Sequence, residues 1–185
     1  RNFVIGVDGG TESIRAGVFD TKGNPLAYAS TNYQTNFPYP GWAEQEPRDW
    51  WKALAVSVRK AVQDSGIAAE QVSALAVDTT CCSVVALDDS GDPLRPALIW
   101  MDVRSANQAE LVADCEDPAL RVNSNGKGPV SAEWMIPKAL WLKQNEPEIF
   151  EKAAIICEYQ DYLNFQLTGR LVSSINNVAT RWHFD

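Results

Sequence analysis

The clearest chemical signal in the sequence is an acidic, glycine-rich segment near the N-terminus. Residues 8–11 read Asp-Gly-Gly-Thr, and Ser13 and Arg15 follow them between two apolar stretches. Glycines let a backbone approach a phosphate closely, and backbone N–H groups and hydroxyls supply hydrogen-bond donors. A carboxylate fixed at a strand end can serve the metal ion that accompanies the phosphate. The segment indicates nucleotide chemistry, although a tight turn in which the carboxylate accepts backbone hydrogen bonds fits the same residues.

A second polar segment, residues 78–83, follows an apolar stretch and has the sequence Asp-Thr-Thr-Cys-Cys-Ser. Ligands of open α/β sheets bind beyond the carboxyl ends of the strands, so this segment is expected at the rim of a site. The alternative is a buried turn in which Cys81 and Cys82 are small core hydrophobes. For the cysteines taken alone, this alternative is the better interpretation.

A third segment combines an aromatic ring with charged groups. Trp100 is followed by Asp102 and Arg104. Charged hydrogen bonds to hydroxyls and apolar contact with C–H surfaces suit a polyol. A surface ion pair next to a core tryptophan explains the same residues equally well.

Two other segments have structural explanations. Residues 131–134 (Ser-Ala-Glu-Trp) resemble a helix-capping signature, with Ser131 as the predicted cap. Helix entry and core packing account for the three tryptophans of residues 41–51. His183 is the single histidine of the chain, which nearly excludes a Ser–His or Cys–His nucleophilic triad.

Charge and composition limit the partners and the compartment. A net charge of −8 argues against nonspecific binding to nucleic acid or to an anionic membrane. No apolar run approaches the roughly 20 residues that span a bilayer, and no signal-peptide pattern opens the chain. The four cysteines lack a CxxC spacing, which indicates a reduced, cytoplasmic setting. Because the chain starts without Met and ends abruptly, we expect a fragment of a longer protein.

The spacing of apolar and turn residues predicts strands alternating with helices. Strands are expected at residues 3–8, 13–19, 26–33, 72–77, 83–87, 97–100 and 155–157. The apolar run at 72–77 predicts a central strand covered on both faces. Pro47 is expected to open a helix that Gly66 ends, with Trp51, Leu54, Ala55, Val58 and Val62 on its buried face. Further helices are expected at residues 105–114, 137–145, 147–153 and 161–168, the last ended by Gly169.

The order of these elements predicts the fold class. Three antiparallel strands followed by helix–strand units are typical of a ribonuclease H-like α/β domain with a mixed sheet, the fold of actin-like ATPases. The helix-rich stretch after residue 104 is expected to be a helical insertion or lobe.

Several motifs, taken as a set, resemble a known family. They are Ile-Gly-Val-Asp8-Gly-Gly-Thr11, Trp42-Ala-Glu-Gln-Glu-Pro47-x-x-Trp50, Trp100-Met-Asp102-x-Arg104, Pro137-Lys138-x-Leu-Trp141-Leu and Asp161-Tyr-Leu-x-x-x-Leu-Thr168-Gly169. The set resembles the N-terminal domain of FGGY carbohydrate kinases over nearly the whole chain. Within that family, residues 78–80 and 131–134 look more like ribulose kinases than xylulose or glycerol kinases.

The resemblance implies ATP-dependent phosphorylation of a sugar hydroxyl with Mg²⁺. Family members place the sugar mainly on the first of two ribonuclease H-like domains and ATP mainly on the second. Residues 1–185 are therefore expected to be the sugar-binding N-terminal domain, incomplete and without the C-terminal ATP-binding domain. The resemblance further implies a cytoplasmic protein that binds a small sugar or polyol, with a homodimer as one possibility.

The resemblance also assigns roles to individual positions. Asp8 corresponds to the carboxylate near the transferring phosphate and the metal, which it is expected to hold through water. The loop that faces the nucleotide phosphates includes Gly10, Thr11, Ser13 and Arg15. The residues expected at the sugar are Cys81, Cys82, Trp100, Asp102, Arg104 and Glu133. Other members have Met-His or Arg-Glu in place of the two cysteines, which leaves the identity of the sugar open.

The general base of the family is an Asp in a later glycine-rich loop, and no such segment occurs before Asp185. The fragment alone is therefore predicted to be inactive. Within the enzyme class, the alternative is a kinase for xylulose, erythritol or another polyol. Outside it, the alternatives are a non-catalytic sugar-binding module and an actin-like scaffold, against which residues 42–51 and 100–104 weigh.

Overall fold

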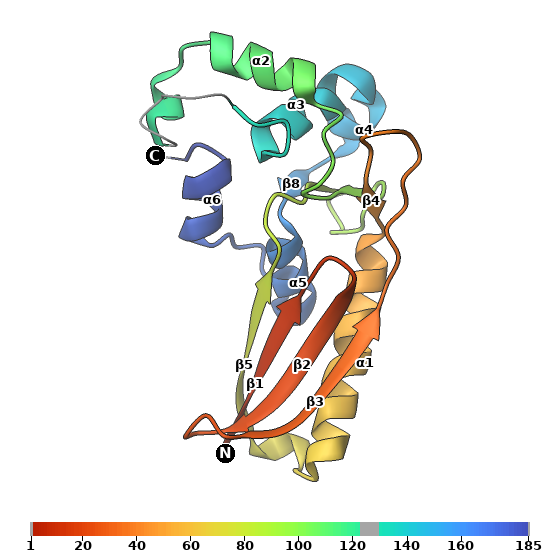
Figure 1. Cartoon of the computed structure of the whole chain (residues 1–185), viewed down its shortest axis with the longest axis vertical. Helices are drawn as coiled ribbons and strands as arrows, with labels where there is room; N and C mark the ends of the chain where they lie inside the picture. The colour runs from red at the N-terminus through yellow and green to blue at the C-terminus, as the bar shows by residue number, and fades with distance from the viewer. Residues whose placement is uncertain (1, 123–129, 185) are drawn as a thin grey trace. The chain divides into compact units, whose positions relative to one another are not determined.

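The computed structural model describes residues 2–122 and 130–184, which fold into two compact units (Figure 1). The sheet unit comprises Arg1–Thr35 and Arg48–Thr80, and the helical unit comprises Asn36–Pro47 and Cys81–Asp185. No helix within the described ranges is both long enough and apolar enough to cross a membrane.

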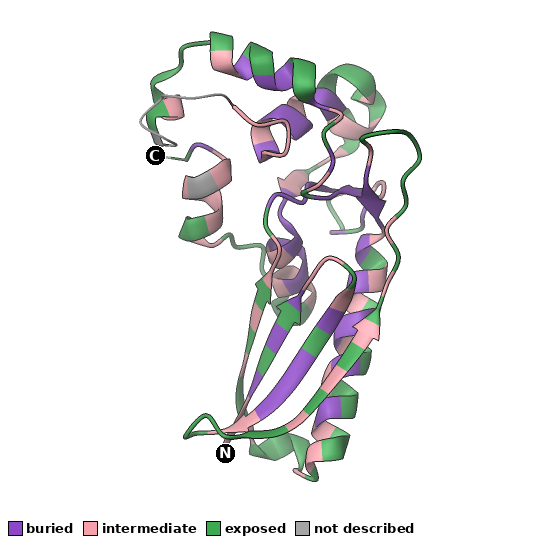
Figure 2. Cartoon of the chain, viewed as in Figure 1, coloured by how far each residue is buried: buried purple, intermediate pink, exposed green. Residues whose placement is uncertain are grey.

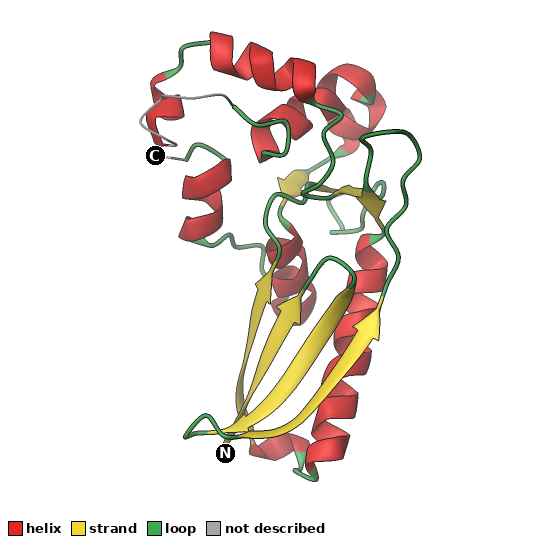
Figure 3. Cartoon of the chain, viewed as in Figure 1, coloured by secondary structure: helices red, strands yellow, loops and turns green. Residues whose placement is uncertain are grey.

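Four strands form the mixed sheet of the sheet unit, in the order β3-β2-β1-β5 (Figure 3). Their bounds are β1 (Phe3–Gly9), β2 (Ser13–Asp20), β3 (Pro25–Asn32) and β5 (Val72–Thr79). The first three are antiparallel, whereas β5 runs parallel to β1. The predicted mixed α/β architecture is confirmed. The prediction succeeded because local alternation and turn residues define these strands.

The position of β5 differs from the prediction. Its apolar sequence predicts a central strand, but among the described residues β5 is an edge strand that pairs with β1 alone. Ala74, Ala76 and Asp78 are exposed on it. An apolar run indicates that a strand can be buried, but it does not specify which neighbours cover it.

Helix α1 (Pro47–Ser65) packs against one face of this sheet. The Ser57 hydroxyl donates a hydrogen bond to the Ile14 carbonyl at 3.0 Å and is 2.9 Å from Thr31 Oγ1. The buried residues of the helix are Pro47, Trp50, Ala53, Leu54, Ser57 and Ala61. Leu54 lies on the buried face as predicted, while the other predicted positions are half-buried at its border. The prediction missed Ser57 because a hydroxyl does not enter an apolar pattern.

The helical unit contains two small sheets and a series of helices (Figure 3). β4 (Glu44–Gln45) pairs with β7 (Ala97–Leu98), and β6 (Val85–Leu87) pairs with β8 (Ile155–Cys157). The helices are α2 (Ala106–Asp114), α3 (Met135–Asn145), α4 (Pro147–Lys152), α5 (Tyr159–Thr168) and α6 (Ile175–Arg181), with 3-10 turns at Ala69–Gln71 in the sheet unit and Pro118–Val122 here. The predicted helical addition is confirmed, and α6 was not predicted.

The start of α3 corrects another expectation. Ser131 is not the helix cap, because α3 begins at Met135 and Trp134 is the residue that precedes it. Ser131 instead closes a turn: its Oγ accepts from the Glu133 N–H at 3.2 Å and its carbonyl accepts from the Trp134 N–H at 3.0 Å. The predicted stop at Gly169 is confirmed, since this residue ends α5 with a φ of 68°, a conformation that glycine adopts without steric cost.

Candidate functional site

The predicted phosphate segment forms the turn between β1 and β2, with its charged residues on the open face of the sheet. Asp8 and Arg15 are direct cross-strand partners, and Arg15 Nη2 lies 2.7 Å from Asp8 Oδ2. Both side chains stay about half exposed, at 54% and 60%. Alternate residues of β1, Ile5 and Val7, are buried on the other face (Figure 2). The strand alternation therefore presents this ion pair to solvent, where a ligand can reach it.

The turn itself is held by its own backbone. The Gly10 N–H donates to the Ser13 carbonyl at 3.0 Å, and the Gly10 carbonyl accepts from the Tyr33 hydroxyl. The expectation that the backbone donors of this turn are free is therefore wrong for Gly10. A Cβ at Gly10 would lie 3.3 Å from Arg15 Nη2, so a larger residue would crowd the ion pair. Thr11 and Ser13 are half-buried.

A second carboxylate lies next to Asp8 in the sheet. Asp78 of β5 is the register partner of Asp8, and side chains of paired parallel residues share a face. Asp78 is exposed. Among the described residues, no three His, Cys, Asp or Glu side chains gather as a metal-ligand set. Mg²⁺ is commonly bound through one or two carboxylates together with substrate phosphates and water, and this pair fits that requirement.

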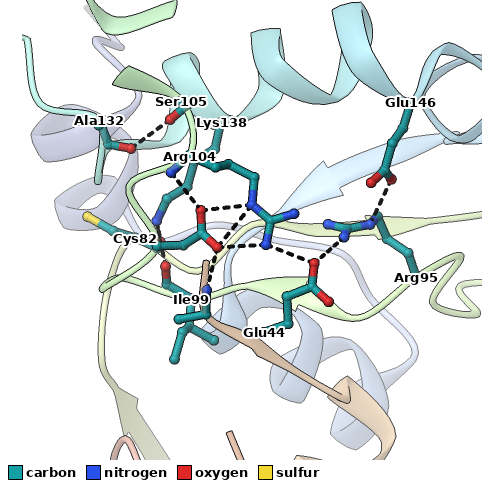
Figure 4. A network of polar contacts seen from close by, with 11 residues as sticks. Glu44, Cys82, Arg95, Ile99, Arg104, Ser105, Ala132, Lys138 and Glu146 are labelled. Atoms are coloured by element: carbon teal, nitrogen blue, oxygen red, sulfur yellow. Dashed lines mark hydrogen bonds and ion pairs between the residues drawn. The ribbon is translucent and has the colours of Figure 1, made fainter. Parts of the chain in front are cut away.

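The helical unit contains a buried ionic network around Arg104 (Figure 4). Arg104 Nη2 lies 2.7 Å from Asp102 Oδ2 and 2.8 Å from Glu44 Oε1. Asp102 Oδ2 also accepts from the Ala43 N–H at 2.6 Å. Glu44 Oε1 receives a second guanidinium, that of Arg95, at 2.5 Å. The network ties the segment before β4 to the turn after β7.

Two tryptophans cover the Arg104 guanidinium. Its Cζ lies 3.6 Å from the ring centre of Trp42 and 4.9 Å from that of Trp141, so the cation faces both π-systems. The side chains of Arg104 and Asp102 are 0% exposed. The interpretation as a surface ion pair is thus wrong, and neither side chain presents a polar atom to a ligand in this structure. Direct contact with a sugar stays a prediction for both, and the geometry supports a positioning role.

Two buried titratable groups also hold the loop that contains the two cysteines. Glu158 accepts from the N–H groups of Cys82 and Ser83 at 3.2 Å each. Lys138 Nζ donates to the carbonyls of Cys82 and Ile99 at 2.8 and 2.7 Å (Figure 4). Cys82 has a φ of 65°, which is uncommon for a residue with a side chain. Lys138 and Glu158 therefore fix the Cys82 backbone from both sides.

The surroundings of Lys138 and Glu158 shift the pKa of both groups. Burial lowers the pKa of Lys138 to about 8, because the apolar interior disfavours the ammonium form. Burial raises the pKa of Glu158 to about 8, although the hydrogen bonds from Cys82 and Ser83 oppose that rise. Buried titratable groups with shifted pKa values are typical of functional sites, although structural networks shift pKa values too.

The remaining predicted sugar residues have accessible surface. Trp100 is 38% exposed, Glu133 is half-buried and Cys81 is exposed. Cys82 belongs to the apolar core with Val84, Leu98, Met135, Trp141 and Leu142. The core interpretation of the cysteines is therefore right for Cys82 and wrong for Cys81.

Sequence reasoning did not single out Glu44, Lys138 and Glu158 as site residues. A signal existed for the first two, because they lie in the motifs at residues 42–50 and 137–142. The structure shows that these motifs and the one at 100–104 meet at the Arg104 network. Glu158 gave no signal, since a single carboxylate before a helix is ordinary.

The helical unit also has a cavity of about 490 Å³ that none of the predicted site residues lines. Its lining is mostly apolar but includes Asp161 and His183. Burial raises the pKa of Asp161 and lowers that of His183, so each group's uncharged form is favoured. The Asp161 carboxylate accepts hydrogen bonds from the Glu158 N–H at 3.1 Å and the Ser173 hydroxyl at 2.7 Å, which ties it to the α5 terminus.

Comparison with known proteins identifies the family. The chain matches the FGGY family of carbohydrate kinases, N-terminal domain, over residues 3–185. It is 32% identical over 180 residues to the xylulose kinase of Lactococcus lactis, covering 96% of this chain and 35% of that protein. It is 30% identical over 210 residues to the ribulokinase of Geobacillus thermodenitrificans, covering 99% of this chain and 37% of that protein.

A solved structure gives the same result. The xylulose kinase of Rhodospirillum rubrum superposes with a TM-score of 0.87 at 30% identity, over 96% of this chain and 36% of that one. The chain thus spans about a third of the length of the relatives it matches. The predicted ribonuclease H-like, actin-like ATPase fold is confirmed. The chain belongs to the FGGY family of carbohydrate kinases.

Proposed function

We propose that the full-length protein containing this chain is an ATP-dependent kinase for a ketopentose, most specifically of the ribulose type. The observation that carries the proposal is the family match over residues 3–185, together with relatives named xylulose kinase and ribulokinase. The exposed Asp8–Arg15 pair and the partly exposed residues of the helical unit offer groups that suit phosphate and sugar binding.

On the nucleotide side, Asp8 and its register partner Asp78 would hold Mg²⁺, because their two carboxylates favour the cation. The metal, when bound, neutralises charge on the phosphate oxygens. Arg15 holds the Asp8 carboxylate and offers its remaining N–H groups to phosphate. Gly10 lets the backbone of the turn approach a phosphate closely. Thr11 and Ser13 add hydroxyl groups. Phosphoryl transfer depends mainly on such positioning.

On the sugar side, Trp100 offers a ring face to sugar C–H groups, while Glu133 and Cys81 offer polar atoms to hydroxyls. Cys82 contributes through its backbone, which Lys138 and Glu158 hold in place. Asp102 and Arg104 support this surface from within, because both are covered. The general base is proposed to lie in a later part of the protein, with the rest of the ATP-binding domain.

A substrate panel tests the ribulose assignment. The full-length protein is incubated with ATP, Mg²⁺ and D-ribulose, L-ribulose, D-xylulose, erythritol or glycerol, and ADP release is followed by a coupled assay. The proposal predicts the highest kcat/KM with a ribulose. Activity confined to xylulose or a polyol would keep the kinase and reject the ribulose assignment, whereas turnover of none would reject the kinase function.

The second candidate is a sugar-binding module without turnover, in which the partly exposed Trp100, Glu133 and Cys81 bind a sugar. Calorimetry of sugar binding, combined with the ADP-release assay, separates the two functions, since a module binds sugar but releases no ADP. A cytoplasmic location and a homodimer are parts of the same proposal. Fractionation of the source cells and sedimentation of the full-length protein test them.

A further inference from the structure

Cys81 and Cys82 form an adjacent pair of thiols with opposite environments. Their Sγ atoms lie 3.7 Å apart, with the Cys82 thiol as the hydrogen-bond donor to Cys81 Sγ. Cys81 is exposed, whereas Cys82 is 4% exposed. One sulfur can therefore meet a reagent in solution while the other stays in the core as its donor.

The geometry of the pair is imposed by groups that are not cysteines. The Cys82 carbonyl accepts from Lys138 Nζ at 2.8 Å, and its N–H donates to Glu158 at 3.2 Å. These contacts hold Cys82 at a φ of 65°, a conformation that residues with a Cβ rarely adopt. The fixed backbone sets the direction of the Cys82 side chain, and packing in the apolar core restricts its rotation away from Cys81.

We propose that Cys81 is a site of reversible modification by small-molecule disulfides, with Cys82 as the hydrogen-bond donor that stabilises its thiolate. Cys81 Sγ attacks one sulfur of a disulfide of the glutathione type. The disulfide bond breaks, a new S–S bond forms at Cys81, and the released thiolate takes a proton from water. Excess thiol reverses the reaction by the same exchange.

The charges around the pair agree with this assignment. The Cys82 hydrogen bond lowers the pKa of Cys81 to about 6, burial opposes that shift, and Arg181 of α6 and Lys138 of α3 support it. The hydrogen bond with Cys81 raises the pKa of Cys82, and burial and the nearby Glu158 carboxyl group add to that rise. Burial keeps the Cys82 thiol protonated after Cys81 is modified, so Cys82 does not displace the added group and the mixed disulfide persists.

Two other cysteines serve as references in the same chain. Cys115 is exposed and has no neighbouring cysteine, whereas Cys157 is buried and burial raises its pKa. Of the four thiols, Cys81 alone combines exposure with a thiol donor among the described residues. Cys115 serves as the control for the effect of exposure alone, and Cys157 as the control for the effect of burial.

The test follows each cysteine by peptide mass spectrometry after timed reaction with glutathione disulfide from pH 5 to 9. The midpoint in pH is the readout rather than the rate at one pH, because a lower pKa also weakens the intrinsic nucleophile. We expect the Cys81 midpoint near pH 6, with Cys82 and Cys157 unmodified in the folded protein. Dithiothreitol should remove the added group.

Cys82→Ala removes the donor and should move the Cys81 midpoint to about pH 8, toward that of an ordinary thiol. Cys115→Ala is the matched control and should leave it in place. If circular dichroism shows that Cys82→Ala does not fold, the pH midpoints of Cys81 and Cys115 in the wild-type protein are compared instead. The proposal is overturned if Cys81 and Cys115 respond alike to pH, or if folded Cys82→Ala keeps the original midpoint. The readout is independent of kinase activity.

Discussion

Each of the two units contains a carboxylate–arginine pair, and the pairs differ in almost everything except distance. Asp8–Arg15 and Asp102–Arg104 both have an N···O separation of 2.7 Å. The first pair is about half exposed on a strand surface, and the second is 0% exposed beneath two tryptophans. A short contact therefore does not reveal a role, whereas the surroundings do.

The energetics of the two environments point in opposite directions. An exposed ion pair is worth little to folding, because water already solvates both partners. A buried pair is expensive to desolvate, and removal of one partner leaves an uncompensated charge. The exposed pair is thus free to serve a ligand, while the buried pair serves the fold.

Arg104→Met breaks the buried network and carries the largest expected effect. It leaves Asp102 and Glu44 without their shared guanidinium, so the free energy of unfolding should fall by about 3–5 kcal/mol in urea denaturation. Arg15→Met is the matched control and should change it by less than about 1 kcal/mol. Equal losses from the two variants would contradict the contrast between the units.

The pH dependence of stability tests the buried environment of Glu158 in the helical unit. The folded state keeps its proton up to about pH 8, whereas the unfolded chain releases it near its ordinary value of 4.5. Between these values the native state binds more protons, so this residue makes stability fall as pH rises from 5 to 8. Urea denaturation of the wild type should therefore show a steeper fall than Glu158→Gln over that range. Parallel curves would reject a buried, protonated Glu158.

Lys138→Met tests whether a buried cation holds the cysteine loop. Two buried carbonyls lose their donor, and each unsatisfied group costs about 1–3 kcal/mol, less what relaxation recovers. Lys60→Met removes an exposed helical pair with Asp64 and should cost about 0.5 kcal/mol or less. Thermal denaturation of both variants compares a buried with an exposed lysine.

Ser57→Ala gives the smallest loss among the variants that remove a buried contact, and it concerns a polar contact of the sheet unit. The hydroxyl donates to the Ile14 carbonyl, so its removal should lower the free energy of unfolding by about 1 kcal/mol. Denaturant titration measures this change. Stabilisation would show that this contact contributes less than the helix propensity gained with alanine.

Sequence reasoning succeeded where the determinants are local. The strands β1 to β3 and the stop at Gly169 follow from alternation and turn chemistry within a few residues. Sequence reasoning failed where contacts between distant segments determine the burial of a residue. The spacing of Asp102 and Arg104 says nothing of Trp42 and Trp141, which bury them.

The same distinction applies to the site. Asp8 and Arg15 were predicted from one short segment, and the register of β1 and β2 brings them together. The role of Lys138 and Glu158 depends on a tertiary contact with the Cys82 backbone, which no local pattern specifies. The motifs as a set indicated the family, because their order carries information that no single motif has.

The most direct test of the central claim is Asp8→Asn in the full-length protein, measured for both ketopentose phosphorylation and thermal stability. The account predicts a loss of kcat of at least about 100-fold, on the scale of other electrostatic contributions to catalysis, with an unchanged melting temperature. Undiminished kcat in a folded variant would show that the exposed pair does not serve the phosphate. A loss of activity that tracks a fall in melting temperature would show that it serves the fold instead.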